Sequence, residues 1–253
     1  MAEVFDMLDK IRNYYKLSSH EIRGLIISII VIAFIVSFNA WGPGSTFVPS
    51  IGLFNFFNSI LIVTLSILVH DTGQRLWGLA IGYRVEFKMW TYGLIFALAL
   101  AFVSAGKIWL IVPGGFMLHL IAGHRLGWFR YNINYFGLGM VALAGPLFTL
   151  MLIIFLKVLY VFFQSPLILL AIKFNAIYVI TSLLPIPPLD GSKIYFGSRM
   201  LYAFALPTIL VSTILMIVDV PIMLTLIVSF LVGIILWMTY YITFERKLWR
   251  GPL

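Results

Sequence analysis

The chain has 253 residues, of which 62% are hydrophobic and 10% charged, and its formal net charge is +8. Soluble domains carry about 25% charged residues, so this composition excludes an ordinary soluble protein and indicates an integral membrane protein. Cysteine is absent, which excludes disulfides and thiolate metal sites. The polar stretch 1–16 has neither the basic tip nor the short apolar core of a cleavable signal peptide. No polar linker interrupts the sequence, and we expect a single membrane domain over residues 1–253.

Eight apolar segments follow one another along the chain, each bounded by charge, Gly or Pro: 25–39, 51–69, 91–106, 108–122, 137–163, 167–184, 201–217 and 221–243. A transmembrane helix needs about 20 residues. The pattern therefore predicts an all-α, multi-pass membrane protein with about 6–8 transmembrane helices. The third and fourth segments are short. They form either two spans or one span and a re-entrant piece broken at Pro113-Gly114-Gly115.

The placement of positive charge predicts the orientation of these segments. If the N-terminus is cytoplasmic and all eight segments span, every Lys and Arg except Lys107, Lys157 and Lys173 lies at the cytoplasmic side. This bias is the positive-inside rule, and it places both termini in the cytoplasm. Orientation and contact with anionic lipid heads explain the net positive charge without nucleic acid. The lipid bilayer is thus the expected partner, and no soluble small-molecule substrate is evident.

The stretch YRVEFKM, residues 83–89, alternates apolar and polar residues without a break. A period of two predicts a half-buried strand rather than a helix. One interpretation is a short hairpin at the membrane interface. The other is an edge strand that receives an extended peptide from a partner.

The stretch HDTGQ, residues 70–74, follows the second apolar segment. On a helix, His70 and Gln74 lie on the same face because they are four residues apart, and Asp71 lies beside them. A zinc-binding HExxH helix uses this geometry, with two His ligands and a Glu that activates water. Here Gln replaces the second His, and Asp replaces the Glu. Polar residues at a membrane surface are the simpler interpretation of these five residues taken alone.

A second motif supplies another carboxylate. The stretch 175–194 contains Pro185, Pro187 and Pro188, which must break a helix at the end of an apolar segment. Asp190 follows this break, and acidic residues within a membrane usually mark a site. In the predicted topology His70 and Asp190 both lie near cytoplasmic helix ends, so two helices can bring them together.

With both motifs, the sequence resembles the site-2 protease family of intramembrane zinc metalloproteases. LLPIPPLDGSK resembles the LDG signature of that family, and HDTGQ occupies the place of its HExxH. ALAGPL, residues 142–147, and the strand 83–89 are similar to further family segments. The resemblance covers a core of about residues 51–200 and leaves residues 201–253 as additional C-terminal helices.

The resemblance implies a role for each site position. His70 and Asp190 match zinc ligands, whereas Gln74 replaces the second zinc His and Asp71 replaces the general-base Glu. Ser182 replaces the polar Asn that precedes the LDG aspartate. Two further positions follow from the same comparison: Thr149 stands where an Asn is frequent, and Asn175 keeps the family pattern.

These departures predict a degenerate site. A neutral amide oxygen is a poorer zinc ligand than imidazole, and the shorter Asp71 withdraws its carboxylate from the reacting position. We therefore expect no bound cofactor, with zinc as the alternative. His119 and His124 are the candidate substitutes for the missing ligand, although a loop at the membrane boundary explains them more simply.

The expected function is that of a pseudoprotease. Such a protein binds other transmembrane proteins as a complex subunit or a membrane chaperone without cleaving them. The alternative is an active or altered metalloprotease that cleaves transmembrane substrates. The residues expected to contact a partner lie on the strand and beside the LDG motif: Arg84, Val85, Glu86, Phe87, Pro187 and Pro188, with Ser182 nearby.

Overall fold

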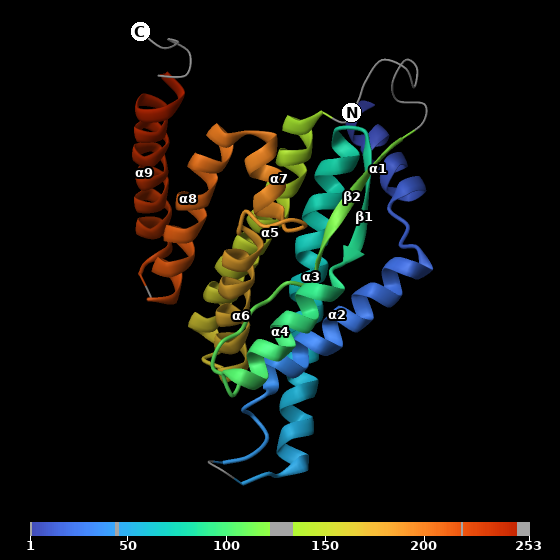
Figure 1. Cartoon of the computed structure of the whole chain (residues 1–253), viewed down its shortest axis with the longest axis vertical. Coiled ribbons are helices and arrows are strands. Elements are labelled where there is room, and N and C mark those ends of the chain that lie inside the picture. Colours follow the sequence, from blue (N-terminus) through green and yellow to red (C-terminus); the bar gives the residue numbers. More distant parts are fainter. Residues whose placement is uncertain (1, 44–45, 122–133, 219, 247–253) are drawn as a thin grey trace.

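A computed structural model of the chain describes residues 2–43, 46–121, 134–218 and 220–246. It is an all-α membrane protein with a small two-stranded sheet (Figure 1). In chain order the elements are α1 (Ala2–Tyr14), α2 (Ser19–Ser37), α3 (Pro49–Ala80), β1 (Tyr83–Met89), α4 (Thr91–Val103), β2 (Gly114–Leu120), α5 (Tyr135–Phe162), α6 (Pro166–Ser182), α7 (Asp190–Gly197), α8 (Arg199–Ile217), α9 (Ile222–Tyr240) and the π-helical turn η1 (Tyr241–Glu245).

Within the described residues, five helices are long and apolar enough to cross a membrane: α2, α3, α5, α8, and α9 continued by η1. The helices α4 and α6 are apolar but shorter, with 13 and 17 residues. Seven of the eight apolar segments therefore fall in helices. The prediction of an all-α membrane protein with a short β segment is confirmed.

The fourth apolar segment, 108–122, is not a helix in its described part. It runs as extended chain and then forms β2. The Gly pair after Pro113 disfavours a helix here, and other elements supply its hydrogen bonds. Ser28 donates to the backbone oxygen of Pro113 at 3.1 Å, and Thr181 donates to that of Ile111 at 2.7 Å. Irregular backbone at membrane depth is tolerated where protein covers it in this way. Of the two arrangements that the sequence left open for 91–122, the described residues contain one helix, α4, and no second helical span.

The strand predicted over 83–89 is present as β1, and it pairs antiparallel with β2. Val85 lies opposite Leu118, and Phe87 lies opposite Phe116. Tyr83, Val85 and Phe87 are buried, as the alternating pattern requires. The helix α4 separates the two strands in sequence, so they do not form a simple hairpin.

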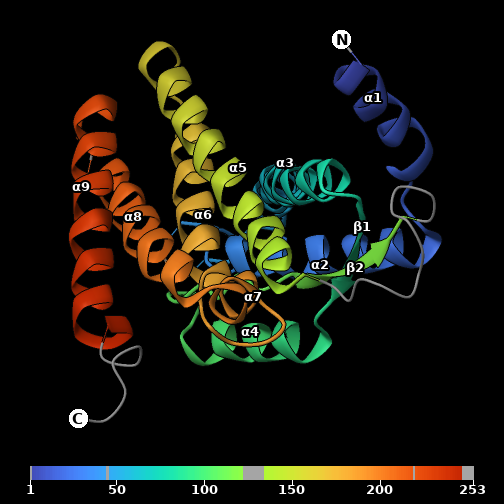
Figure 2. The same ribbon diagram turned by 90° about the horizontal axis from the view of Figure 1, so that it is seen from above.

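The helix α3, with 32 residues, is the central support of the site. Seen from above, α8 and α9 stand at one side of the bundle and α1 at the other, with α3, α5 and α6 between them (Figure 2). One hydrophobic core is continuous from α2 to α8. The helix α1 and the C-terminal end of α9 lie at the same end of the molecule (Figure 1). The cytoplasmic orientation of that end stays a prediction.

Candidate functional site

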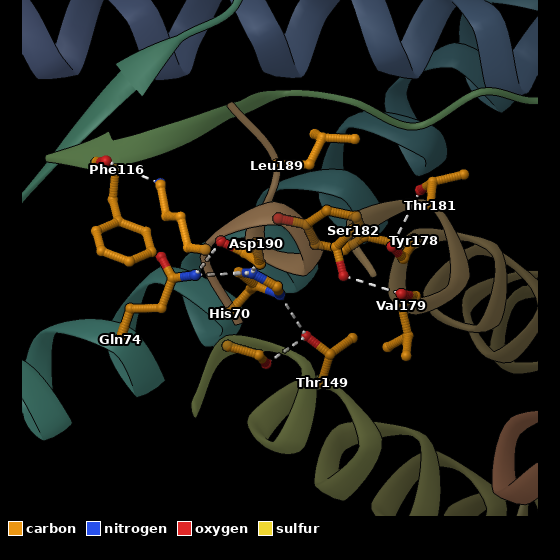
Figure 3. Close-up of polar contacts among 12 residues, drawn as sticks. His70, Gln74, Phe116, Thr149, Tyr178, Val179, Thr181, Ser182, Leu189 and Asp190 are labelled. Atoms are coloured by element: carbon orange, nitrogen blue, oxygen red, sulfur yellow. Dashed lines mark hydrogen bonds and ion pairs between the residues drawn. The ribbon is translucent and has the colours of Figure 1, made fainter. Parts of the chain in front are cut away.

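The site is built by the C-terminal half of α3 and the first residue of α7, two positions 116 or more residues apart in the sequence. His70 Nε2 lies 2.8 Å from Asp190 Oδ2, and the Gln74 amide nitrogen donates to Asp190 Oδ1 at 2.9 Å (Figure 3). The Gln74 nitrogen also lies 3.3 Å from His70 Nε2. All three side chains are buried. The structure thus brings together the three positions at which the resemblance implies zinc ligands.

Thr149 of α5 orients the imidazole of His70 from the other side. The Thr149 hydroxyl donates to the Gly145 carbonyl at 3.1 Å, and its oxygen lies 2.9 Å from His70 Nδ1 (Figure 3). Since the hydroxyl has one hydrogen, His70 Nδ1 is the donor in this second contact. His70 Nε2 therefore faces Asp190, with which it forms a hydrogen bond.

The segment 142–147 places α5 directly against the motif helix. A Cβ atom on Gly145 would lie 2.4 Å from His70 Nε2 and 2.7 Å from the Gln74 amide nitrogen. A Cβ atom on Gly73 would lie 2.6 Å from the ring of Phe148. Both glycines are therefore required for the close approach of α3 and α5. Sequence reasoning selected the segment but not this role.

Asp71 does not point into the group formed by His70, Gln74 and Asp190. Its Oδ2 accepts from Arg75 Nε at 2.5 Å, and Arg75 in turn donates to Glu21 Oε1 at 2.5 Å. Glu21 is the third helical residue of α2 and forms a capping box with Ser18. The second carboxylate oxygen of Asp71 is buried without a hydrogen-bond partner among the described residues. The position that matches the family's general base is thus held in an ion-pair network.

The same network closes the outer edge of β1. Arg75 Nη1 donates to the Val85 carbonyl at 3.1 Å, and Glu21 Oε1 accepts from the Phe87 N–H at 2.9 Å. These two backbone groups are the ones that an added strand would need at this edge. Sequence reasoning missed Glu21 and Arg75. Two signals pointed to them: the Ser18-x-x-Glu21 capping box, and Arg75 four residues after Asp71 on the same helix face.

The other predicted partner residues of β1 have contacts within the chain. Arg84 donates to the Lys16 carbonyl at 3.4 Å. Glu86 pairs with His119 at 2.9 Å, on the exposed side of the sheet. Val85 and Phe87 are buried. A partner that pairs with this sheet must therefore use the outer edge of β2 rather than β1.

A small cavity of about 10 Å³ lies between this group and the sheet. This volume holds about one water molecule. The ring of Tyr178 lies with its centroid 4.7 Å from that of His70 and borders the cavity. The complete lining is Ile67, His70, Asp71, Gln74, Phe87, Gly114, Gly115, Tyr178 and Asp190. The sheet therefore covers one side of the site.

Ser182 and the prolines lie beside the cavity without lining it. The Ser182 hydroxyl donates to the Val179 carbonyl of its own helix at 2.9 Å, so it is directed away from the reacting position (Figure 3). Asn175 likewise donates to the Ala171 carbonyl at 2.8 Å. Pro187 and Pro188 form the turn that delivers Asp190 to the start of α7.

The described residues do not fit a zinc site. Within them, no group of three or more His, Asp or Glu side chains is placed to hold a metal ion. His70 and Asp190 are two suitable ligands, but Gln74 presents its amide nitrogen to Asp190, and a nitrogen that donates to a carboxylate is not a metal ligand. His119 is engaged with Glu86. His124, the other candidate substitute, lies outside the described residues.

Comparison with known proteins gives one informative relationship. No family model matches the chain, and no solved structure matches it. A protein of Methanocaldococcus jannaschii, named "Putative zinc metalloprotease", is 27% identical over 194 residues. The match covers 75% of this chain and 90% of that protein. The chain is similar to a metalloprotease-like protein.

Proposed function

We propose that this protein is a non-proteolytic relative of the site-2 proteases that binds segments of other membrane proteins. In this role it acts as a complex subunit or a membrane chaperone. The observation that carries the proposal is the hydrogen-bonding of Asp190. Its two oxygens are engaged by His70 and Gln74, so the three positions satisfy one another without a metal ion.

The ion pair of Asp71 supports the loss of proteolysis. A general base must reach the proton that it removes, either directly or through one water molecule. One oxygen of Asp71 is held at 2.5 Å by Arg75, and the Arg75 charge stabilises the carboxylate in that position. Ser182 donates within its own helix. Ser182 and one oxygen of Asp71 are thus engaged by groups other than a reacting substrate.

Binding of a membrane segment is supported by the sheet over the site. Gly114 and Gly115 at the start of β2 line the cavity, and three residues of this strand are exposed: Met117, His119 and Leu120. Strand addition needs only backbone groups and shallow contacts for alternate side chains. The Pro187-Pro188 turn holds α7 against this strand. A scaffold that binds partners without cleaving them depends on this arrangement of turn, helix and strand rather than on zinc ligands.

Restoring the two motif positions tests the scaffold. The double variant Asp71→Glu and Gln74→His should bind zinc, because a His at position 74 faces His70 and Asp190. Zinc is measured by elemental analysis of protein purified in detergent. The control is Asn58→His, which adds a His to α3 about three turns from the site and should bind none. A folded double variant without zinc would show that the helices do not hold a metal-site geometry.

Crosslinking in native membranes tests partner binding. Photoreactive residues at Arg84 and Glu86, on the exposed side of the sheet, and at Met117 should capture a membrane protein. Phe162, the last residue of α5, is 73% exposed and is the control. Capture at Phe162 or on α9 with none at the sheet would contradict a binding surface beside the site.

A metal-dependent protease of altered chemistry is the second candidate. Two observations favour it: the printed name of the Methanocaldococcus jannaschii protein, and the unpartnered oxygen of Asp71 beside a cavity for one water. Cleavage of a model transmembrane substrate by the wild-type protein would establish it, provided that His70→Ala abolishes the cleavage.

A further inference from the structure

Lys193 joins α7 to the outer edge of β2. It lies on the first turn of α7, three residues after Asp190. Its ammonium donates to the backbone oxygen of Phe116 at 2.8 Å and lies 3.5 Å from the centroid of the Phe116 ring. Phe116 is the third residue of β2, and its carbonyl and ring are drawn in Figure 3. One side chain therefore makes both a hydrogen bond and a cation–π contact with the same residue of the strand.

The carbonyl that Lys193 occupies is the one that an added strand would use. Phe116 lies opposite Phe87, whose N–H points away from β2 toward Glu21. In such a non-hydrogen-bonded antiparallel pair, both residues turn their backbone groups outward. Phe116 consequently turns its carbonyl to the outer edge of β2.

The described sheet has one edge left for a further strand. Arg75 and Glu21 close the outer edge of β1. At β2, Lys193 covers the Phe116 carbonyl, and a Cβ atom on Gly115 would lie 2.3 Å from the Pro188 carbonyl oxygen. The start of β2 is therefore held against the proline turn and α7, and pairing there requires Lys193 to leave Phe116.

Lys193 has no carboxylate partner among the described residues, because no Asp or Glu oxygen there lies within 4.0 Å of its ammonium. The oxygens of nearby Asp190 are engaged by His70 and Gln74. An ammonium group has three donors, and Phe116 takes one of them. Two donors of the ammonium therefore remain for a further acceptor.

We propose that Lys193 selects the partner: an extended apolar segment that carries one Asp or Glu pairs with the outer edge of β2, and its carboxylate takes the ammonium of Lys193. The released Phe116 carbonyl then accepts an N–H of the incoming strand. Lys193 then loses its hydrogen bond to the Phe116 carbonyl. In exchange, Lys193 gains a charge-assisted hydrogen bond to the carboxylate, and Phe116 gains a backbone hydrogen bond to the incoming strand. This inference rests on the proposed binding function and states which segments it accepts.

Two synthetic single-span peptides test the selection. Each has an apolar helix followed by an extended Val- and Thr-rich segment, with one Glu in the first peptide and Gln at that position in the second. Affinity is measured with the full-length protein in nanodiscs of phosphatidylcholine, which has no net charge. The wild-type protein should bind the Glu peptide about tenfold more tightly than the Gln peptide, the effect of one favourable charge pair.

Three variants separate the Lys193 ammonium from total charge and folding. Lys193→Met should abolish the preference for Glu, and Lys193→Arg should retain most of it. Lys88→Met, on the exposed side of β1, removes the same charge from the sheet and should leave the preference unchanged. Loss of the preference in Lys88→Met as well would assign it to net charge and overturn the inference.

The absence of cysteine allows the contact to be located, because Met117→Cys gives the chain a single thiol. A peptide with Cys near its Glu should form a disulfide with this variant. If both peptides form the disulfide and bind wild type equally, the selectivity of Lys193 is refuted while binding at the sheet stands. If neither peptide binds or forms the disulfide, the binding function at this sheet is refuted together with the inference.

Discussion

Gln74 and Asp71 differ from a zinc-protease site in where they direct their polar atoms. The NH₂ end of Gln74 must face Asp190, because a carboxylate accepts hydrogen bonds and cannot donate them when ionised. Asp71 is turned to Arg75. Each of these two side chains is thus stabilised by a contact with a charged neighbour. The contacts of these two side chains, rather than the loss of ligands alone, define the present site.

The buried Glu21 should be important for stability. Its carboxylate is fully buried and accepts from Arg75, the Phe87 N–H and the Ser18 N–H. Removing one member of a buried ion pair typically costs about 3–5 kcal/mol. We expect Glu21→Ala to lower the thermal unfolding midpoint strongly, whereas His20→Ala, at the exposed neighbouring position, should change it little. Equal midpoints for the two variants would show that the network does not stabilise the fold.

The burial of Lys193 should make the free energy of unfolding rise at alkaline pH. Partial burial lowers the pKa of Lys193 from 10.5 to about 8, and Asp190 opposes this shift. Between these two values the unfolded chain binds the proton more strongly than the folded protein, so the free energy of unfolding increases as pH rises through this window. The thermal midpoint of wild type relative to Lys193→Met should therefore rise from pH 7.5 to pH 10. A difference between the two midpoints that stays constant with pH would contradict a desolvated Lys193 ammonium.

At the scale of elements, close packing of α3 on α5 and the covered strand β2 position the site. The helix α5 approaches His70 through Gly145 and holds its imidazole through Thr149. The extended chain before β2 lies within the bundle because Ser28 and Thr181 satisfy its carbonyls. Each of these contacts joins segments that are far apart in the sequence.

Gly145→Ala tests the helix contact. The added Cβ atom would lie 2.4 Å from His70 Nε2, and overpacking of this kind typically costs about 1–3 kcal/mol. The matched control is Gly137→Ala on the same helix, where the nearest atom would lie at 3.5 Å. We expect a lower unfolding midpoint for Gly145→Ala and an unchanged or higher one for Gly137→Ala, because Ala favours a helix. A stable Gly145→Ala protein would contradict the α3–α5 contact.

The elements show what the sequence alone could predict. Apolar length located seven of the eight segments as helices, and alternation located β1. Apolar composition does not distinguish a helix from extended chain covered by protein, so the sequence left 108–122 open between a second span and a re-entrant piece broken at Pro113-Gly114-Gly115. The convergence of His70 and Asp190 followed from two motifs. The pairing of Arg75 with Glu21 did not, because no local pattern links residues 54 positions apart.

At the scale of the whole molecule, one hydrophobic core continues from α2 to α8. The sheet and α7 close over His70 and Asp190, and the remaining cavity has room for about one water molecule. The helices α8 and α9 stand at the side of the bundle, away from the sheet (Figure 2). This architecture encloses a polar group whose members His70, Gln74 and Asp190 contact one another.

The zinc content of the purified wild-type protein tests this central claim most directly. The protein is purified in detergent without added metal or chelator, and zinc per chain is measured by elemental analysis beside His70→Ala. Because His70, Gln74 and Asp190 satisfy one another, we predict far less than one zinc ion per chain, with no difference between the two proteins. Nearly one zinc ion per wild-type chain, lost in His70→Ala, would contradict the account.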